Sequence, residues 1–200
     1  MTKPRLTYFD FSGRGEDARL AYFIAGVDFE DNRIKGAAWR ELKPSTPFGG
    51  LPTLEIEGKG VLAQSNAILT YIGREHGLHP QDNWEAARHE ALMAAVEELR
   101  GAISRTLGLS PDEKRRVREE LAAGEMQTWG ANVERQLGDG PFVAGEALSV
   151  VDLKLFVLLN WFVSGTLDHV PADVFRGFPR LMGVFEAVRR HPRVVAWYAR

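Results

Sequence analysis

The sequence predicts an N-terminal α/β domain followed by a domain built only of helices. Short β-type runs alternate with helical runs over about the first 80 residues, and no β-type run follows them. A polar, proline-bearing segment, His79-Pro80-Gln81-Asp82-Asn83, separates the two parts. We therefore expect an α/β domain over 1–78, a linker over 79–83 and an all-helical domain over 84–200.

The N-terminal elements are expected in the order βαβα followed by ββα. Gly26 ends the first helical pattern, because glycine readily takes the left-handed conformation found after helices. Gly58-Lys59 forms the turn of a hairpin between two β-type runs. The expected strands are 5–9, 29–34, 53–57 and 60–63, and the expected helices are 15–25, 37–43 and 65–75.

The C-terminal part shows apolar residues at helical spacing throughout. After a first helix over 84–107, Ser110-Pro111 supplies an N-cap and a first-turn proline for a helix running to about 137. Ser149 and Asp152 form a capping-box pattern, and 153–162 is apolar almost all round, which predicts a buried helix. Two more helices are expected to begin near Pro179 and Pro192.

Composition excludes several classes of function. The 200 residues are 44% apolar and 26% charged, as in ordinary soluble globular proteins, and the net charge of −2 gives no footprint for nucleic acid or an anionic membrane. With no cysteine, the chain has no disulfide, no cysteine-ligated metal and no thiol of its own. The N-terminal residues lack an apolar signal segment and no run reaches transmembrane length, so we expect a cytosolic protein without a membrane partner.

The most informative stretch runs from Pro47 to Ile56. Pro52 follows two glycines at the head of a strand, which predicts a tight turn, and an X-Pro bond is the one place where a cis peptide is readily tolerated. Such a turn exposes the backbone of Leu51 to a ligand. Gln64-Ser65 then opens a helix, where backbone N–H groups and the helix dipole attract a carboxylate. A backbone edge beside an anion site suits a small peptide.

Tyr8 ends the first strand, just before a glycine-containing loop. Its hydroxyl can point across the next helix N-terminus at a ligand, although a lone tyrosine there can also be a half-buried strand aromatic. Ser12 is a competing hydroxyl, without a hydrolase motif around it. Gly13-Arg14-Gly15 lacks the third glycine of a dinucleotide site, which leaves the glycines for the turn and Arg14 as an anion clamp or ion-pair partner.

Trp39 and Lys43 lie four residues apart, on one face of a short helix. An indole N–H and an ammonium together can bind a carboxylate, and a core tryptophan beside a solvated lysine explains the pair equally well. His76 and His79 have no partner at metal-ligand spacing, so no metal site is expected.

Several of these motifs occur together in one known family. They are Leu6-Thr7-Tyr8-Phe9, Gly13-Arg14-Gly15, Trp39, Lys43, Pro47-Phe48-Gly49, Leu51-Pro52, Gln64-Ser65 and Ser149-Val150-Val151-Asp152. Over nearly its whole length the chain resembles the glutathione transferases, and among them the sigma class, which includes the glutathione-dependent prostaglandin D synthases. The resemblance implies a thioredoxin-like N-terminal domain, a helical C-terminal domain and a homodimer.

The resemblance also implies roles for individual residues. Tyr8 would hydrogen-bond the glutathione sulfur, with Arg14 supporting the electrostatics around it. The remaining implied binding positions are Trp39 and Lys43 for the glycine carboxylate, Leu51 and a cis Pro52 for the cysteinyl part, Gln64 and Ser65 for the γ-glutamyl end, and Glu98 from the partner subunit, with Glu97 as the alternative.

The activity implied is formation of the glutathione thiolate and its addition to a hydrophobic electrophile, or its use to reduce hydroperoxides. No metal or organic cofactor is required, since glutathione is a co-substrate. The chain departs from many sigma enzymes at Gly50, where they carry a lysine, at Ala94, which replaces a metal-binding carboxylate of the prostaglandin synthases, and in ending at Arg200 without a lid. These departures favour an open electrophile pocket, or, as an alternative, a non-catalytic ligand-binding or crystallin-like protein.

Overall fold

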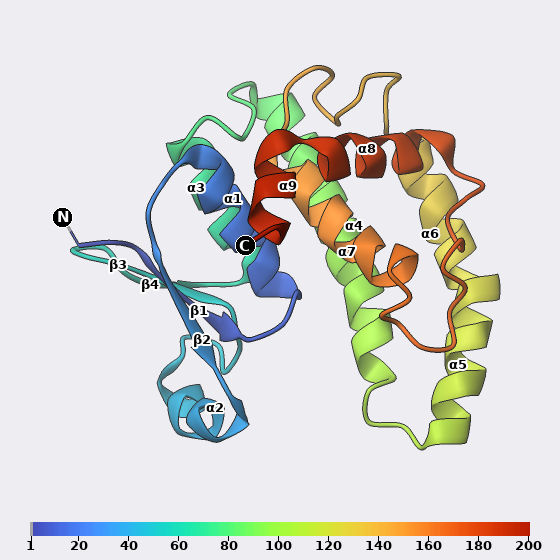
Figure 1. Ribbon diagram of the computed structural model, residues 1–200, viewed down its shortest axis with the longest axis horizontal. Coiled ribbons are helices and arrows are strands. Elements are labelled where there is room, and N and C mark those ends of the chain that lie inside the picture. Colours follow the sequence, from blue (N-terminus) through green and yellow to red (C-terminus); the bar gives the residue numbers. More distant parts are fainter. Residues whose placement is uncertain (1) are drawn as a thin grey trace. The chain divides into compact units, whose positions relative to one another are not determined.

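A computed structural model describes residues 2–200, and these form two compact units (Figure 1). The first unit combines the chain up to Asn83 with His191–Arg200, and the second is Trp84–Arg190. Helix α9 (Pro192–Tyr198) belongs to the first unit because it packs on α1 (Arg14–Ala25). The second unit is therefore shorter than the helical domain expected over 84–200.

The first unit is built on a four-stranded mixed sheet. The strands lie in the order β2-β1-β3-β4, with β1 and β2 parallel and the other neighbours antiparallel. Helices α1 and α3 pack against each other and against the sheet (Figure 1). This arrangement confirms the predicted thioredoxin-like fold. Its elements are β1 (Arg5–Phe9), α1, β2 (Glu30–Ile34), α2 (Gly36–Leu42), a 3-10 turn (Lys43–Ser45), β3 (Thr53–Ile56), β4 (Gly60–Ala63) and α3 (Ser65–Glu75).

The core of the first unit follows from residue spacing. Leu6 of β1 and Leu54 of β3 are paired across the sheet and fully buried. Ile68 and Ile72, four residues apart in α3, are fully buried too, as helical periodicity requires for a face packed on a sheet. Gly26 ends α1 with φ of 72°, the left-handed conformation that favours glycine.

The second unit consists of helices. They are α4 (Asn83–Arg105, whose first residue belongs to the first unit), α5 (Pro111–Ala123), α6 (Glu125–Glu134), α7 (Val150–Val163) and α8 (Pro179–Arg190). Helix α7 is buried at every position from Val150 to Leu159, which confirms the expected core helix. No helix within residues 2–200 combines the length and the apolar character needed to cross a membrane.

The single helix predicted from 111 to about 137 is wrong. Helical geometry is interrupted at Gly124, which has φ of −119° and ψ of −84°, so α5 and α6 are separate helices. Apolar spacing continues through the break and gives no warning of it. The local reason is the glycine, which lacks a Cβ and has a low helix propensity, so the chain can leave helical geometry there.

Asp152 fixes the start of the buried α7. It is fully buried, and its carboxylate accepts hydrogen bonds from the Ser149 backbone N–H (2.8 Å), the Ser149 hydroxyl (2.7 Å) and the Val143 backbone N–H (2.8 Å). Ser149 and Asp152 thus form the predicted capping box, extended to the preceding loop. Burial raises the pKa of Asp152 to about 6, while the hydrogen bonds from Val143 and Ser149 act in the opposite direction.

We predict that Asp152→Asn destabilises the protein by about 1–3 kcal/mol, because an amide NH₂ then faces a buried N–H donor. Since the folded-state pKa lies above the usual value of 3.8, the folded state binds this proton more tightly than the unfolded state. The stabilising contribution of Asp152 is therefore fully present below about pH 4 and is lost as the pH rises through about 6. Urea unfolding should show a larger gap between wild type and variant at acidic than at neutral pH, and a gap that narrows on acidification would contradict this.

Candidate active site

The register of the sheet brings most predicted site residues to one end of it. Thr7 of β1 pairs with Thr53 of β3, and Thr53 pairs with Ala63 of β4. Tyr8 follows Thr7 and Gln64 follows Ala63, whereas Pro52 precedes Thr53 in the antiparallel β3, so all three lie at the same end of the sheet. Strand β2 runs parallel to β1 and leads at that end into α2, which carries Trp39.

Tyr8 is buried at the N-terminus of α1, with 5% of its surface exposed. Its hydroxyl accepts a hydrogen bond from the backbone N–H of Arg14 at 3.1 Å. As an acceptor in this contact the hydroxyl keeps its own proton for donation, and accepting a hydrogen bond strengthens it as a donor. The positive end of the helix dipole also favours negative charge nearby. Tyr8 thus has the setting of a group that stabilises an anion.

The resemblance implies that the charge of Arg14 supports the electrostatics around Tyr8, and this role stays a prediction. The structure shows a hydrogen bond to Tyr8 from the Arg14 backbone N–H, at the first residue of α1. Any residue except proline has that N–H, so the side chain at position 14 is not what makes this hydrogen bond.

Gly13 and Gly15 let the loop lie directly on Tyr8. A Cβ at Gly15 would come within 2.3 Å of the Tyr8 Cγ atom, and a Cβ at Gly13 within 2.5 Å of the Tyr8 hydroxyl oxygen. No side chain fits at either position while Tyr8 keeps its place. The sequence suggested a turn at these glycines, and the structure shows a close approach as well.

Arg19 was missed by the sequence analysis. Its side chain is fully buried, and its guanidinium donates to the backbone carbonyls of Phe9 (3.0 Å) and Phe11 (3.2 Å). It also lies 5.7 Å from the centre of the Tyr8 ring. The available signal was an arginine between Ala18 and Leu20, directly before the apolar and aromatic run from Leu20 to Ala25.

The Leu51-Pro52 peptide bond is cis, as predicted. Pro52 is buried and Leu51 is half-buried at the start of β3. At the end of β4, the exposed Gln64 has φ of 75° and ψ of 117°, a backbone conformation that residues other than glycine rarely adopt. Such a conformation costs on the order of 1–3 kcal/mol and is often retained at functional positions. Gln64 precedes the buried Ser65, which begins α3.

Trp39 and Lys43 lie on and just after α2 and differ in their surroundings. The Trp39 ring is half-buried and meets the Phe9 ring edge-on, with 5.8 Å between centroids. Lys43 is exposed at the turn that follows α2. Trp39 is thereby attached to the end of β1 next to Tyr8, while the carboxylate-binding role of the pair stays a prediction.

In the second unit, Glu97 and Glu98 of α4 have different environments. Glu97 forms ion pairs with two fully buried cations, Lys154 (2.6 Å) and Arg100 (3.1 Å). Glu98 is exposed and lines a hollow of about 240 Å³, together with Arg88 and Ala95. Of the two carboxylates, Glu98 is the one presented at the surface of this unit.

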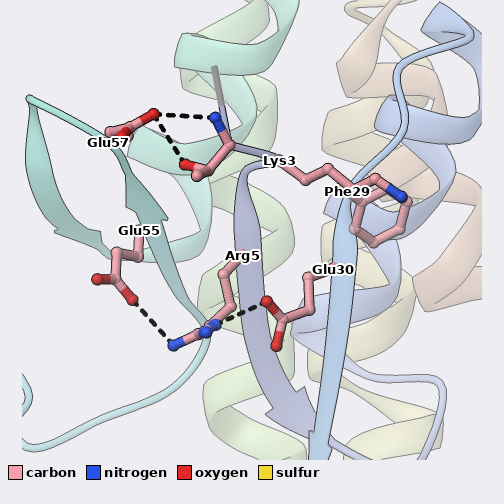
Figure 2. Close-up of a pocket in the computed structure, with 7 residues that line it drawn as sticks. Lys3, Arg5, Phe29, Glu30, Glu55 and Glu57 are labelled. Carbon is pink, nitrogen blue, oxygen red and sulfur yellow. Dashed lines mark hydrogen bonds and ion pairs between the residues drawn. The ribbon is translucent and has the colours of Figure 1, made fainter.

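A second hollow, of about 670 Å³, lies at the opposite end of the sheet from Tyr8 (Figure 2). Its charged side chains have partners within the protein: Arg5 pairs with Glu30 (2.9 Å) and Glu55 (3.5 Å), and Glu57 accepts from the Thr2 backbone N–H (2.9 Å). Lys3 pairs with Asp28 (2.7 Å). This hollow gathers none of the predicted site residues. Within residues 2–200, no three His, Cys, Asp or Glu side chains are grouped so that they could hold a metal ion.

Comparison with known proteins gives the class to which this fold and site belong. The family model of the glutathione S-transferase N-terminal domain matches residues 4–74, and that of the C-terminal domain matches residues 97–200. The chain belongs to the glutathione S-transferase family, which confirms the family expected from its motifs.

Individual relatives match over almost the full length. Glutathione S-transferase 1 of Ascaris suum is 35% identical over 206 aligned residues, covering 100% of this chain and 97% of the relative. Hematopoietic prostaglandin D synthase of Gallus gallus is 30% identical, covering 98% of this chain and 96% of that protein. The solved glutathione S-transferase from Ascaris lumbricoides superimposes with a TM-score of 0.87 at 34% identity, covering 99% of this chain and 97% of that one.

Gly15→Ala should destabilise the protein, because the new methyl group collides with the Tyr8 ring; overpacking of this kind costs about 1–3 kcal/mol. The matched control is Gly183→Ala in α8, where nothing lies within 4 Å of the added Cβ. There we expect no loss, or a gain of up to about 1 kcal/mol, since alanine is the better helix former. Thermal unfolding of both variants and the wild type measures the change in stability. Equal melting temperatures of Gly15→Ala and Gly183→Ala would refute the close approach of Gly15 to the Tyr8 ring.

Proposed function

We propose that this protein binds glutathione at the end of the sheet that carries Tyr8, holds its sulfur as the thiolate, and adds it to hydrophobic electrophiles. The observation that carries the proposal is the buried Tyr8 hydroxyl, which accepts the Arg14 N–H at the start of α1, beside the cis Leu51-Pro52 turn. Membership of the glutathione S-transferase family supports it.

The reaction requires a change in the pKa of the glutathione thiol. A free thiol with a pKa of about 8.5 is only a few per cent thiolate at neutral pH, and the thiolate is the nucleophile. A phenolic hydroxyl donating to the sulfur stabilises the anion relative to the thiol. Lowering the pKa by roughly two units corresponds to about 2.7 kcal/mol of differential stabilisation, within the range of one hydrogen bond to a charged group.

The rest of the tripeptide would be held by groups around Tyr8. The Leu51 backbone before Pro52 would pair with the cysteinyl part, in the manner of an added strand. Gln64 and Ser65 would receive the γ-glutamyl carboxylate at the N-terminus of α3, where N–H groups and the helix dipole favour an anion. The glycine carboxylate would reach the Trp39 indole N–H and the Lys43 ammonium, with no lysine at Gly50 to assist.

The same thiolate can reduce hydroperoxides. It attacks one oxygen of the O–O bond, an alcohol leaves, and a second glutathione releases the disulfide and water from the sulfenic acid formed. Both reactions are tested together by assaying the purified protein with glutathione and 1-chloro-2,4-dinitrobenzene, an isothiocyanate or cumene hydroperoxide. Turnover on any of them supports the proposal. Retention on glutathione-agarose without turnover and without thiolate absorbance would favour a ligand-binding or crystallin-like protein instead.

Tyr8→Phe should lower turnover by about 10- to 1000-fold with near-normal glutathione affinity, because one donor that stabilises the developing charge is lost. Tyr22→Phe is the matched control: Tyr22 is equally buried in the same unit, and among the described residues its hydroxyl has no hydrogen-bond partner. That control should retain turnover. Full activity in Tyr8→Phe together with its loss in Ser12→Ala would show that Ser12 supplies the hydroxyl.

We further propose a homodimer in which Glu98 reaches the γ-glutamyl amine bound to the partner subunit. In a two-fold dimer each such contact occurs twice, so both active sites would contain residues from both chains. The surface position of Glu98 and the engagement of Glu97 with Lys154 and Arg100 favour Glu98 for this role.

Glu98→Gln should raise the apparent dissociation constant for glutathione about tenfold. The variant loses a charge-assisted hydrogen bond, and a loss of about 1.4 kcal/mol of binding free energy corresponds to a factor of ten. Glu119→Gln changes another exposed glutamate of the same unit and should leave the constant unchanged. Sedimentation should show a dimer for the wild type and for both variants. A fully active monomer, or glutathione binding unaffected in Glu98→Gln, would refute the shared site.

A further inference from the structure

We propose that Arg19 is a positioning residue for Tyr8, and that Trp197 of the last helix holds Arg19 in place through Glu16. The inference rests on the proposed thiolate-stabilising role of Tyr8 and adds to it a connection between the C-terminal helix and the loop that covers Tyr8. All residues involved belong to the first unit.

Arg19 fixes the segment between β1 and α1. Its Nη2 atom donates to the Phe9 carbonyl at 3.0 Å, and its Nη1 atom donates to the Phe11 carbonyl at 3.2 Å. One planar guanidinium thus spans two carbonyls that are two residues apart. A lysine ammonium, a single point of charge, cannot reproduce this geometry together with the two ion pairs that Arg19 also makes.

Glu16 connects Arg19 to the C-terminal helix. Its side chain is 3% exposed; Oε2 accepts from Arg19 Nη1 at 3.2 Å, and Oε1 accepts from the Trp197 indole N–H at 2.7 Å. The Trp197 ring also packs on Phe23 of α1, with 5.3 Å between centroids. Removing the guanidinium or the indole N–H would leave part of the charge of this buried carboxylate uncompensated.

The second ion pair of Arg19 reaches the same segment from β2. Arg19 Nε donates to Asp31 at 2.8 Å, Asp31 pairs with Arg33 at 2.7 Å, and Arg33 pairs with Asp10 at 2.8 Å. The hydrogen bond from Arg33 lowers the pKa of the exposed Asp10 carboxylate. Residues 9–11 are therefore held at two carbonyls and one carboxylate.

Two other ionisable groups face this cluster. Asp17 of α1 is fully buried beside Glu16 in the sequence. Tyr198 of α9 makes a side-chain hydrogen bond to Glu16, and burial, followed by the negative charge of Glu16 and this hydrogen bond, raises the pKa of its hydroxyl. Asp17 adds a carboxylate next to Glu16 in the sequence, and the Arg19 guanidinium, the Trp197 N–H and the neutral Tyr198 hydroxyl compensate the Glu16 charge.

The position of this segment matters for Tyr8. Phe11 packs against the Tyr8 ring at 5.3 Å between centroids, and the chain continues through Gly13 to the Arg14 N–H that donates to the Tyr8 hydroxyl. If the segment shifts, the donor and the hydroxyl lose their alignment, and small displacements of catalytic groups cost much of the rate. The groups proposed to hold the rest of glutathione, on β3 and α3, are not part of the cluster.

The test compares Trp197→Phe with Arg193→Ala. The first keeps an aromatic ring, although a smaller one, against Phe23 and removes the indole N–H that donates to Glu16. The second removes another contact of α9 with α1, the Arg193 hydrogen bond to the Phe23 carbonyl and its stacking on the Phe23 ring, without touching Glu16. We expect Trp197→Phe to lower kcat about tenfold, to raise the apparent pKa of kcat/KM, and to leave KM for glutathione unchanged. Arg193→Ala should change none of these beyond twofold. Equal effects of the two variants, or no effect of Trp197→Phe, would overturn the proposal.

A double-mutant cycle gives the second measurement. Arg19→Lys should lower kcat as well, and its combination with Trp197→Phe should be less severe than the product of the two single effects, because both act through Glu16. A double variant whose fold-loss of kcat equals the product of the two single losses would overturn the connection between Trp197 and Arg19. Glu16→Gln should give the same kcat and pKa changes as Trp197→Phe, and normal kinetics in that variant would overturn it as well. If the wild type forms no thiolate with glutathione, the proposed function itself is refuted. If the wild type turns over and Tyr8→Phe has a reduced kcat, but Trp197→Phe has the kcat of the wild type, only this inference is refuted.

Discussion

The first unit depends on one buried guanidinium. Burying a charge is costly unless it is paired and hydrogen-bonded, and Arg19 meets that condition by contacting Glu16, Asp31 and two backbone carbonyls while fully excluded from solvent. These partners come from α1, β2 and the segment after β1. Placing this charge therefore requires the helix, the edge strand and the connecting segment to be in position together, which is why the surroundings of Tyr8 are built as one piece.

The surroundings of Tyr8 are formed mainly by backbone. Its hydroxyl accepts from a backbone N–H, two glycines lie against the residue, and the cis Leu51-Pro52 peptide directly precedes the neighbouring strand β3. These features come from the chain path and not from charged side chains aimed at a substrate. Such a site is preorganised, because the donor is fixed by the helix that contains it. The strained Gln64 at the adjacent strand end fits the same pattern.

The second unit is built around a helix, α7, that is mostly apolar. Helix α7 is buried at every position from Val150 to Leu159, so it is a core element whose start must be specified by polar groups at its end. The Ser149–Asp152 capping box does this and also anchors the preceding loop through Val143. Lys154, two residues after Asp152, is fully buried and pairs with the half-buried Glu97 of α4, so a charge pair also joins the two helices. The carboxylate next to it, Glu98, remains at the surface.

Local patterns determined much of this protein. Apolar spacing, glycine turns and caps predicted the order of the elements, and motif residues such as Tyr8, Leu51-Pro52 and Gln64-Ser65 predicted the family. The sequence could not separate α5 from α6 at Gly124, because apolar spacing is unchanged there. It could not show that the Arg14 backbone N–H donates to Tyr8, nor that Arg19 joins Phe9, Glu16 and Asp31. Nor could it group α9 with α1 through Trp197 and Glu16, residues 181 apart in sequence. Those facts depend on contacts between distant segments, which only the folded chain brings together, whereas caps, turns and periodicity are set by neighbours along it.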